Sequence, residues 1–143
     1  MTDATETTLS VERTLELAAP PEGVWRALTD PEELARWFPD RVDQEGFGPG
    51  AQGRFFWEKH GAYAFRVEAA ERPRRLVWCW ARDAETPLDE GVTTQIEWVL
   101  QPRDDGGTTL HLCESGFVRS EDREGNSKGW DAELGELVQL LSG

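Results

Sequence analysis

The feature that most constrains the fold is a pair of alternating segments, residues 92–102 and 108–117, joined by a short turn. In the first segment every second residue belongs to one series: Val92, Thr94, Ile96, Trp98 and Leu100. The turn is centred on Asp105-Gly106, a dipeptide typical of β-hairpins. In the return segment Leu110 and Leu112 point to one side, and His111 and Cys113 point to the other. This pair predicts an antiparallel sheet with one buried face.

Further strands are predicted on both sides in the sequence. Residues 11–17 alternate, with Val11, Arg13, Leu15 and Leu17 on the inner side. Residues 54–60, 62–70 and 74–82 are also typical of strands, which gives a sheet of about six. The glycine-rich segment 41–53 is predicted to be a loop.

Helices are predicted at two places. Pro20 and Pro21 can begin a first short helix. Asp30 is a good N-cap for a second, which places Leu34, Trp37 and Phe38 on one apolar stripe. Near the C-terminus the helical period returns in Trp130, Leu134, Leu137, Val138 and Leu141. That last helix begins either at Ser120 or, because glycines weaken its first half, near Ser127.

This order predicts an α+β fold in which the long C-terminal helix packs on the concave face of a curved antiparallel sheet. Residues 1–10 are expected to be a disordered tail, and residues 11–143 are expected to form one domain. The space between the sheet and the final helix is the candidate binding site.

Four segments resemble a known family: "VERTLELAAPPEGVWRALTDPEELARWFPD", "RPRRLVWCW", "GGTTLHLCESGF" and "KGWDAELGELVQLL". They are similar to the SRPBCC (START-like) superfamily and, within it, to the activator of heat-shock-protein-ninety ATPase homologue family. The resemblance implies the helix-grip fold of the birch-pollen allergen, with a hydrophobic cavity under the final helix. Members bind lipids, hormones or polyketides, cyclise polyketides, or activate a chaperone, so the resemblance does not specify one activity.

The charge of the chain restricts its partners. With 28 acidic and 15 basic residues, the formal net charge is −13. Such a surface repels phosphates, so we expect neither nucleic acid nor a membrane as partner. The first ten residues have no basic or apolar region of a signal peptide, and we expect a cytoplasmic protein.

No metal or cofactor is expected. Cys79 and Cys113 lie in apolar strands, and only His60 and His111 could join them as ligands. Their spacing does not form a zinc site. The thiols are expected to be buried and free; a disulfide between them is the alternative, which a cytosolic setting disfavours.

No complete catalytic set is evident, and the weak candidates are Glu114, His60 and Arg13. Glu114 continues the inward series of Leu110 and Leu112, where it could orient a ligand or act as a base; alternatively, the strand bulges and Glu114 reaches solvent. Arg13 is on the inner side of the first strand and could pair with Glu114. The direction of His60 is undetermined.

Large rings are abundant, including seven tryptophans. Those expected on the inner side either fill the core or line a cavity. As ligand-binding residues we predict Trp37, Phe38, Trp57, Tyr63, Phe65, Trp78, Trp80, Trp98, Phe117, Trp130 and Leu134. Phe47, in the glycine-rich segment, is a candidate lid residue. Val77 and Cys79 form an unusually apolar stretch of the outer face, which suggests a covered or dimer-forming surface.

Three functions follow as hypotheses. The first is binding of a small hydrophobic or aromatic molecule in the cavity. The second is a polyketide cyclase or hydrolase that uses polar cavity residues. The third is a co-chaperone that activates a heat-shock ATPase. A homodimer is a further expectation.

Overall fold

The computed structural model describes residues 9–44, 46 and 48–142, and it is an α+β fold built on one antiparallel sheet. The expected tail therefore lies almost entirely outside the described residues, as does Phe47. The strands are β1 (Ser10–Leu17), β2 (Arg41–Gln44), β3 (Gln52–Trp57), β4 (Gly61–Glu71), β5 (Arg75–Ala81), β6 (Thr93–Pro102) and β7 (Thr108–Ser115). The helices are α1 (Pro21–Thr29), α2 (Pro31–Leu34), a 3₁₀ turn (Leu88–Glu90) and α3 (Ser120–Ser142).

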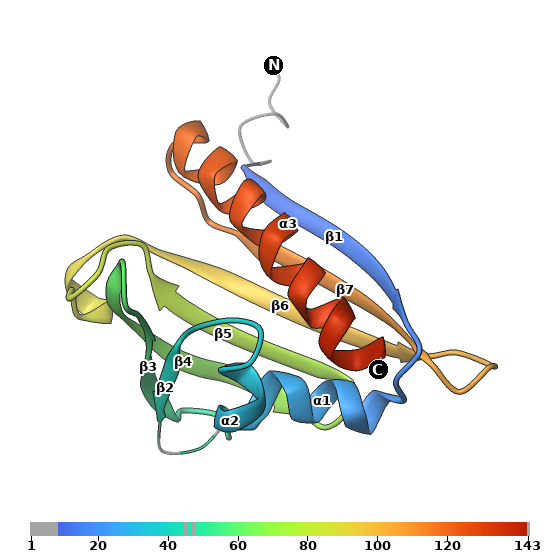
Figure 1. Ribbon diagram of the computed structural model, residues 1–143. Helices are drawn as coiled ribbons and strands as arrows, with labels where there is room; N and C mark the ends of the chain where they lie inside the picture. Colours follow the sequence, from blue (N-terminus) through green and yellow to red (C-terminus); the bar gives the residue numbers. More distant parts are fainter. Residues whose placement is uncertain (1–8, 45, 47, 143) are drawn as a thin grey trace.

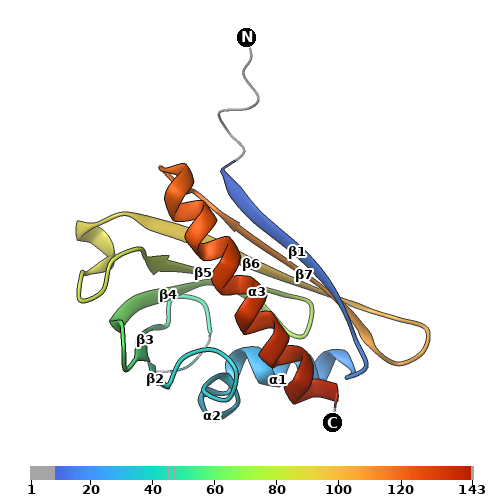
Figure 2. The same cartoon turned by 45° about the horizontal axis from the view of Figure 1, so that its top comes forward.

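The sheet has seven strands in the order β1-β7-β6-β5-β4-β3-β2, and every neighbouring pair is antiparallel. The helix α3 lies diagonally across one face of this curved sheet, and its C-terminal end lies beside α1 (Figures 1 and 2). This arrangement confirms the predicted helix-grip architecture. Among the described residues, no helix is long and apolar enough to cross a membrane.

The β6–β7 hairpin forms as its sequence predicts. Pro102 pairs with Thr108, and the turn is closed by a hydrogen bond from Arg103 N to Gly107 O of 2.9 Å. Gly106 has a φ of 91°, in the left-handed region that glycine adopts without strain. The Asp105 side chain also accepts a hydrogen bond from Gly107 N at 2.9 Å. The turn residues therefore set the register in which β6 and β7 pair, and this register keeps the inner residues of both strands on the same face.

The helix starts also follow local signals. Asp30 Oδ1 accepts hydrogen bonds from the backbone N–H groups of Glu32 and Glu33, so Asp30 caps α2 as expected. The short α2 ends at Leu34, so Trp37 and Phe38, which were expected on the same helical stripe, lie in the turn that follows; all three are buried in the core. The two alternatives for α3 are resolved in favour of Ser120, which begins a continuous helix of 23 residues.

One predicted loop was wrong. Arg41–Gln44 forms β2 and pairs with β3, which makes the strand count seven instead of about six. Gln44 lies opposite Gly53, where a Cβ atom would come within 2.3 Å of the Asp43 carbonyl oxygen. This close approach requires a glycine, so a residue type that suggested a loop serves here to let two strands pair closely.

Of the two alternatives for the outer face, a covered surface is found at Val77, whereas Cys79 is partly exposed. Val77 is only 2% exposed, and its register neighbours are Glu97 and Ala69. Arg75 and Glu97 form an ion pair of 2.6 Å beside it. The two free cysteines lie on this face but on strands separated by β6. The expected dimer-forming surface thus receives no support from an exposed apolar area.

Candidate functional site

A pocket of about 720 Å³ lies at the N-terminal half of α3, between this helix and the adjoining ends of β5, β6 and the β3–β4 turn. Its walls combine rings, charged groups and small residues: Trp57, His60, Tyr63, Trp80, Ala81, Arg82, Asp83, Val92, Thr94, Phe117, Val118, Arg119, Asp122, Gly125, Asn126, Gly129, Ala132 and Glu133. Such a volume is typical of small-molecule sites.

Aromatic rings are a large part of the packed core beside this pocket. Phe38 stacks on Trp130 with a centroid distance of 5.4 Å and an interplanar angle of 6°. Trp78 and Trp98 are completely buried behind them, with their rings 5.8 Å apart. These rings form part of the packed core beneath the helix.

The predicted ligand-binding residues therefore fall into two groups. Four line the pocket: Trp57, Tyr63, Trp80 and Phe117. The other seven lie in the packed core: Trp37, Phe38, Phe65, Trp78, Trp98, Trp130 and Leu134. Alternation places Trp78 and Trp80 on the same face of β5, but only Trp80 reaches the pocket.

A fully buried carboxylate supports the pocket from behind. Glu114, on β7, has no exposed surface. Its Oε1 accepts hydrogen bonds from Trp130 Nε1 at 2.7 Å and from Asn126 Nδ2 at 3.1 Å. Its Oε2 accepts from Trp80 Nε1 at 2.9 Å, from Thr94 Oγ1 and again from Asn126. One side chain thus connects β5, β6, β7 and α3.

These contacts decide how Glu114 can act. It points inward, as its alternation predicts, and the alternative of a bulge that takes it to solvent is wrong. Because N–H and O–H donors occupy both oxygens, Glu114 is poorly placed to take a proton from a ligand. Three of its partners, Trp80, Thr94 and Asn126, line the pocket. Glu114 therefore fixes the orientation of the pocket wall.

Arg13 does not pair with Glu114, contrary to expectation. It bonds to Asp131 at 2.9 Å and to the Ser127 hydroxyl at 2.7 Å, both on α3. The register explains this difference, because Val11 and not Arg13 lies opposite Glu114 on β7. Arg13 attaches the edge strand β1 to the helix.

The two histidines have different positions. His60 lies in the β3–β4 turn, and it is exposed at the wall of the pocket. His111 lies on the outer face, where its ring nitrogens lie 3.0 Å from Thr14 Oγ1 and 3.3 Å from Gln101 Oε1. Only His60 is thus placed to meet a ligand.

A second carboxyl group, Glu133, lies in the pocket itself, and the sequence analysis did not identify it. The pKa of Glu133 is raised to about 7, first by burial and then by the nearby Glu136 and Asp40 charges, while the Trp57 indole opposes the rise. The available signal was helical spacing. Glu133 follows Trp130 by three residues and precedes Leu134, so it lies at the edge of the apolar face.

The other charged groups of the wall neutralise one another. Arg82 bonds to Asp83 at 3.0 Å and to Asp122 at 3.4 Å. The pKa of Asp83 is lowered, first by its hydrogen bond with Arg82. The pKa of Tyr63 is raised by burial and by the Asp83 charge. Within the described part of the chain, no group of three or more His, Cys, Asp or Glu side chains could hold a metal ion.

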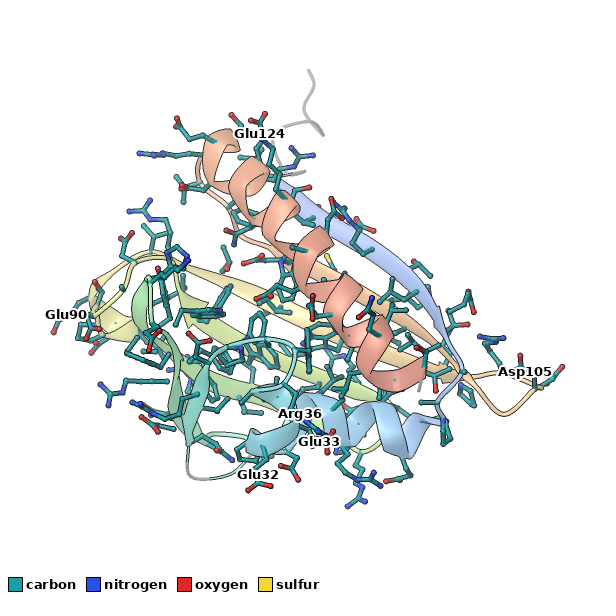
Figure 3. The ribbon with its side chains drawn as sticks, viewed as in Figure 1. Glu32, Glu33, Arg36, Glu90, Asp105 and Glu124 are labelled. Carbon is teal, nitrogen blue, oxygen red and sulfur yellow. The ribbon has the colours of Figure 1, made fainter. Side chains whose placement is uncertain are left out.

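Much of the remaining acidity is spread over the periphery. Figure 3 labels Glu32 and Glu33 at α2, Glu90 before β6, Asp105 at the β6–β7 turn and Glu124 near the start of α3. These residues lie on different elements and do not form one acidic docking face. The distribution fits a charge that favours solubility.

Comparisons with known proteins agree with this architecture. A family model described as "Activator of Hsp90 ATPase homolog 1-like protein" matches residues 18–142. No curated protein matches the chain significantly.

Solved structures give several matches. Protein MLL2253 from Mesorhizobium loti is 26% identical, with a TM-score of 0.80, and the match covers 92% of this chain and 96% of that one. DynU16, a protein of the dynemicin biosynthetic locus, is 25% identical with a TM-score of 0.78; 92% of this chain spans only 46% of DynU16. The Aha1 dimer from Colwellia psychrerythraea shares 20% identity and a TM-score of 0.76 over 93% of this chain and 96% of that one, which shows a common fold.

Proposed function

The chain belongs to the family of Activator of Hsp90 ATPase homolog 1-like proteins, and on this premise we propose that it binds a small hydrophobic or aromatic molecule in the pocket at the N-terminal half of α3. The pocket itself is the observation that carries the proposal. Buried rings and aliphatic side chains pack the core beside α3, yet about 720 Å³ stays open where Trp57, Tyr63 and Trp80 form the wall.

The Glu114 network adds support. Four side chains on β5, β6 and α3 bind the buried carboxylate. These bonds hold the pocket wall in one conformation before a ligand arrives. A preorganised wall lowers the entropy that binding would otherwise lose. Val118, which is 66% exposed, adds an apolar rim to the pocket.

Two glycines of α3 allow a sharp test. Gly129 lines the pocket, Gly135 does not, and a Cβ atom at either position would have no neighbour within 4 Å. Gly129→Leu should therefore fill the pocket, and Gly135→Leu is the matched control on the same helix. We expect the neutral fluorescent probe N-phenyl-1-naphthylamine to bind the wild type and the control equally, and to bind Gly129→Leu at least tenfold more weakly. Failure of the probe to bind the wild type, or equal binding to both variants, would contradict the proposal.

The polyketide cyclase or hydrolase alternative has one supporting observation, since His60 and Glu133 line the same pocket. A carboxyl group that titrates near neutral pH suits general acid–base catalysis. Any turnover found in a substrate screen should then be lost in His60→Ala or Glu133→Gln. Turnover that survives both substitutions would exclude this mechanism.

The co-chaperone and homodimer hypotheses draw on the family name and on a related protein described as a dimer. Stimulation of a heat-shock ATPase by the purified chain would support the first. Light scattering at micromolar concentration would test the second, for which a monomer is the contrary result.

A further inference from the structure

The charged groups of the pocket differ in whether they have a partner of opposite charge. Its wall holds two arginines, Arg82 and Arg119, together with Asp83, Asp122 and Glu133. Arg119 lies 3.2 Å from Glu121 and 3.6 Å from Asp122, and Arg82 is bonded to both aspartates. Both cations and both aspartates are therefore already paired.

Glu133 has no such partner. Within residues 9–44, 46 and 48–142, no Lys, Arg or His nitrogen forms an ion pair with it. The indole of Trp57 lies beside it, and the charges that act on it, those of Asp40 and Glu136, are also negative. A half-buried carboxylate without a cation is unfavourable. In the ligand-free pocket, the negative charge of Glu133 therefore has no positive partner among the described residues.

Three aromatic rings line the same pocket as Glu133. Trp57 lies 5.5 Å from Tyr63 and 6.0 Å from Trp80, and Tyr63 lies 6.2 Å from Trp80. The interplanar angles of 81°, 59° and 43° turn the rings to face different directions around the wall. Ring faces attract a cation, and they attract an apolar body equally well.

We propose that the pocket selects ligands that join an aromatic or apolar body to a protonated amine, with the Glu133 carboxylate as counter-ion and the rings of Trp57, Tyr63 and Trp80 around the ligand. This inference rests on the proposed function and names its ligand class. An anionic ligand would find both arginines already engaged. A neutral ligand would bury Glu133 further without supplying the missing charge.

The affinity should depend on pH. The pKa of Glu133 is about 7 in the free protein, and a bound cation lowers it. The affinity for the amine therefore increases as the pH rises through 7. Below pH 7, binding of the amine releases a proton from Glu133. Asp40 and Glu136 act on Glu133 directly, and the other titratable or charged groups of the pocket are His60, Tyr63, Arg82, Asp83, Arg119 and Asp122. Because His60 is a second titratable side chain of the pocket wall, the pH profile is measured in His60→Gln as well.

Calorimetry with three matched probes tests the proposal: 2-(1-naphthyl)ethylamine, 2-(1-naphthyl)ethanol and 1-naphthylacetate, all at pH 8. We expect the amine to bind at least tenfold more tightly than the alcohol, and the carboxylate most weakly. Glu133→Gln should reduce the amine affinity to that of the alcohol. Glu124→Gln, which removes the same charge from an exposed position near the start of α3 (Figure 3), should leave the preference intact.

The outcomes separate the two proposals. Equal affinity of amine and alcohol, or a preference that survives Glu133→Gln, overturns the cation assignment and leaves the proposed function standing. If none of the probes binds, the proposed function fails as well. Should Glu133→Gln not fold, the wild type and His60→Gln supply the test. Their amine-to-alcohol preference should fall as the pH is lowered below 7, by at most tenfold per pH unit and until the contribution of Glu133 is lost, and a constant preference would refute the role of Glu133.

Discussion

Replacing Glu114 by glutamine should destabilise the protein strongly although it changes few atoms. The amide retains one oxygen, but its NH₂ group must face donors in either orientation. At the Oε1 position it faces Trp130 and Asn126, and at the Oε2 position it faces Trp80, Thr94 and Asn126. The second orientation is preferred, because the Thr94 hydroxyl can rotate to accept a hydrogen bond.

The magnitude follows from the bonds that change. A hydrogen bond to a charged group contributes about 1.5–3 kcal/mol, and a buried donor without an acceptor costs about 1–3 kcal/mol. In the preferred orientation Trp130 keeps an acceptor, although a neutral one, and Trp80 retains Thr94 as a partner at 2.9 Å. We therefore expect Glu114→Gln to lower the free energy of unfolding by about 2–4 kcal/mol. Glu114→Ala removes every acceptor of the network, and we expect about 3–5 kcal/mol.

Urea unfolding followed by circular dichroism measures these differences without relying on the tryptophans in the network. The matched control is Glu97→Gln on the neighbouring strand, where the glutamate side chain is 35% exposed and pairs with Arg75. Its loss should be at most about 1 kcal/mol, as for other exposed ion pairs. If Glu114→Gln and Glu97→Gln lower the stability equally, the buried carboxylate does not organise the site as argued here.

Substitutions at three further places in the structure are tested by the same unfolding assay. The raised pKa of Glu133 means that its ionisation opposes folding, so this group lowers stability as pH rises from about 4.5 to about 7. Glu133→Gln should stabilise the ligand-free protein at pH 8 by only about 1–2 kcal/mol, because the side chain is partly exposed to solvent. The same substitution should have little effect at pH 4.5. An effect that is independent of pH would contradict the raised pKa of Glu133. Asp30→Ala should cost about 1 kcal/mol because α2 loses its cap, whereas Asp30→Asn should retain most of the stability. Leu137→Ala, at a fully buried position of α3, should cost about 2–5 kcal/mol, and Val138→Ala, at a 36% exposed position, should remain within about 0.5 kcal/mol; similar values for both would mean that α3 is not packed as described.

Local patterns were sufficient to predict most of the architecture. Alternation in β6 and β7, with the turn at Asp105-Gly106, assigned the inner and outer residues of the central hairpin, and Asp30 marked the start of α2. The strand β2 was missed because its residues do not alternate clearly and because Gly53, which permits its close pairing, resembles a loop residue. The pairing of β2 with β3 is a contact between two segments, so the hydrophobic period of one segment alone does not predict it.

The candidate site was predictable only in part. The inward direction of Glu114 followed from its position after Leu112, but its partners did not: Arg13 was expected, and Trp80, Thr94, Asn126 and Trp130 were found. Glu133 was missed because its helical spacing places it only at the edge of the apolar face, one carboxylate among 28 acidic residues. Its significance arises from what surrounds it in space.

The neighbouring tryptophans of β5 show where the sequence alone stops. Alternation by itself assigns Trp78 and Trp80 to the same face of the sheet, because successive side chains of a strand point to opposite sides. Whether each ring fills the core or lines a pocket depends on where α3 crosses that face. Phe38 approaches both rings, yet Trp78 is fully buried while Trp80 remains at the pocket wall and bonds to Glu114. The sequence determined the face on which each ring lies, and the diagonal path of the helix, set by long-range packing, decided which of them a ligand can reach.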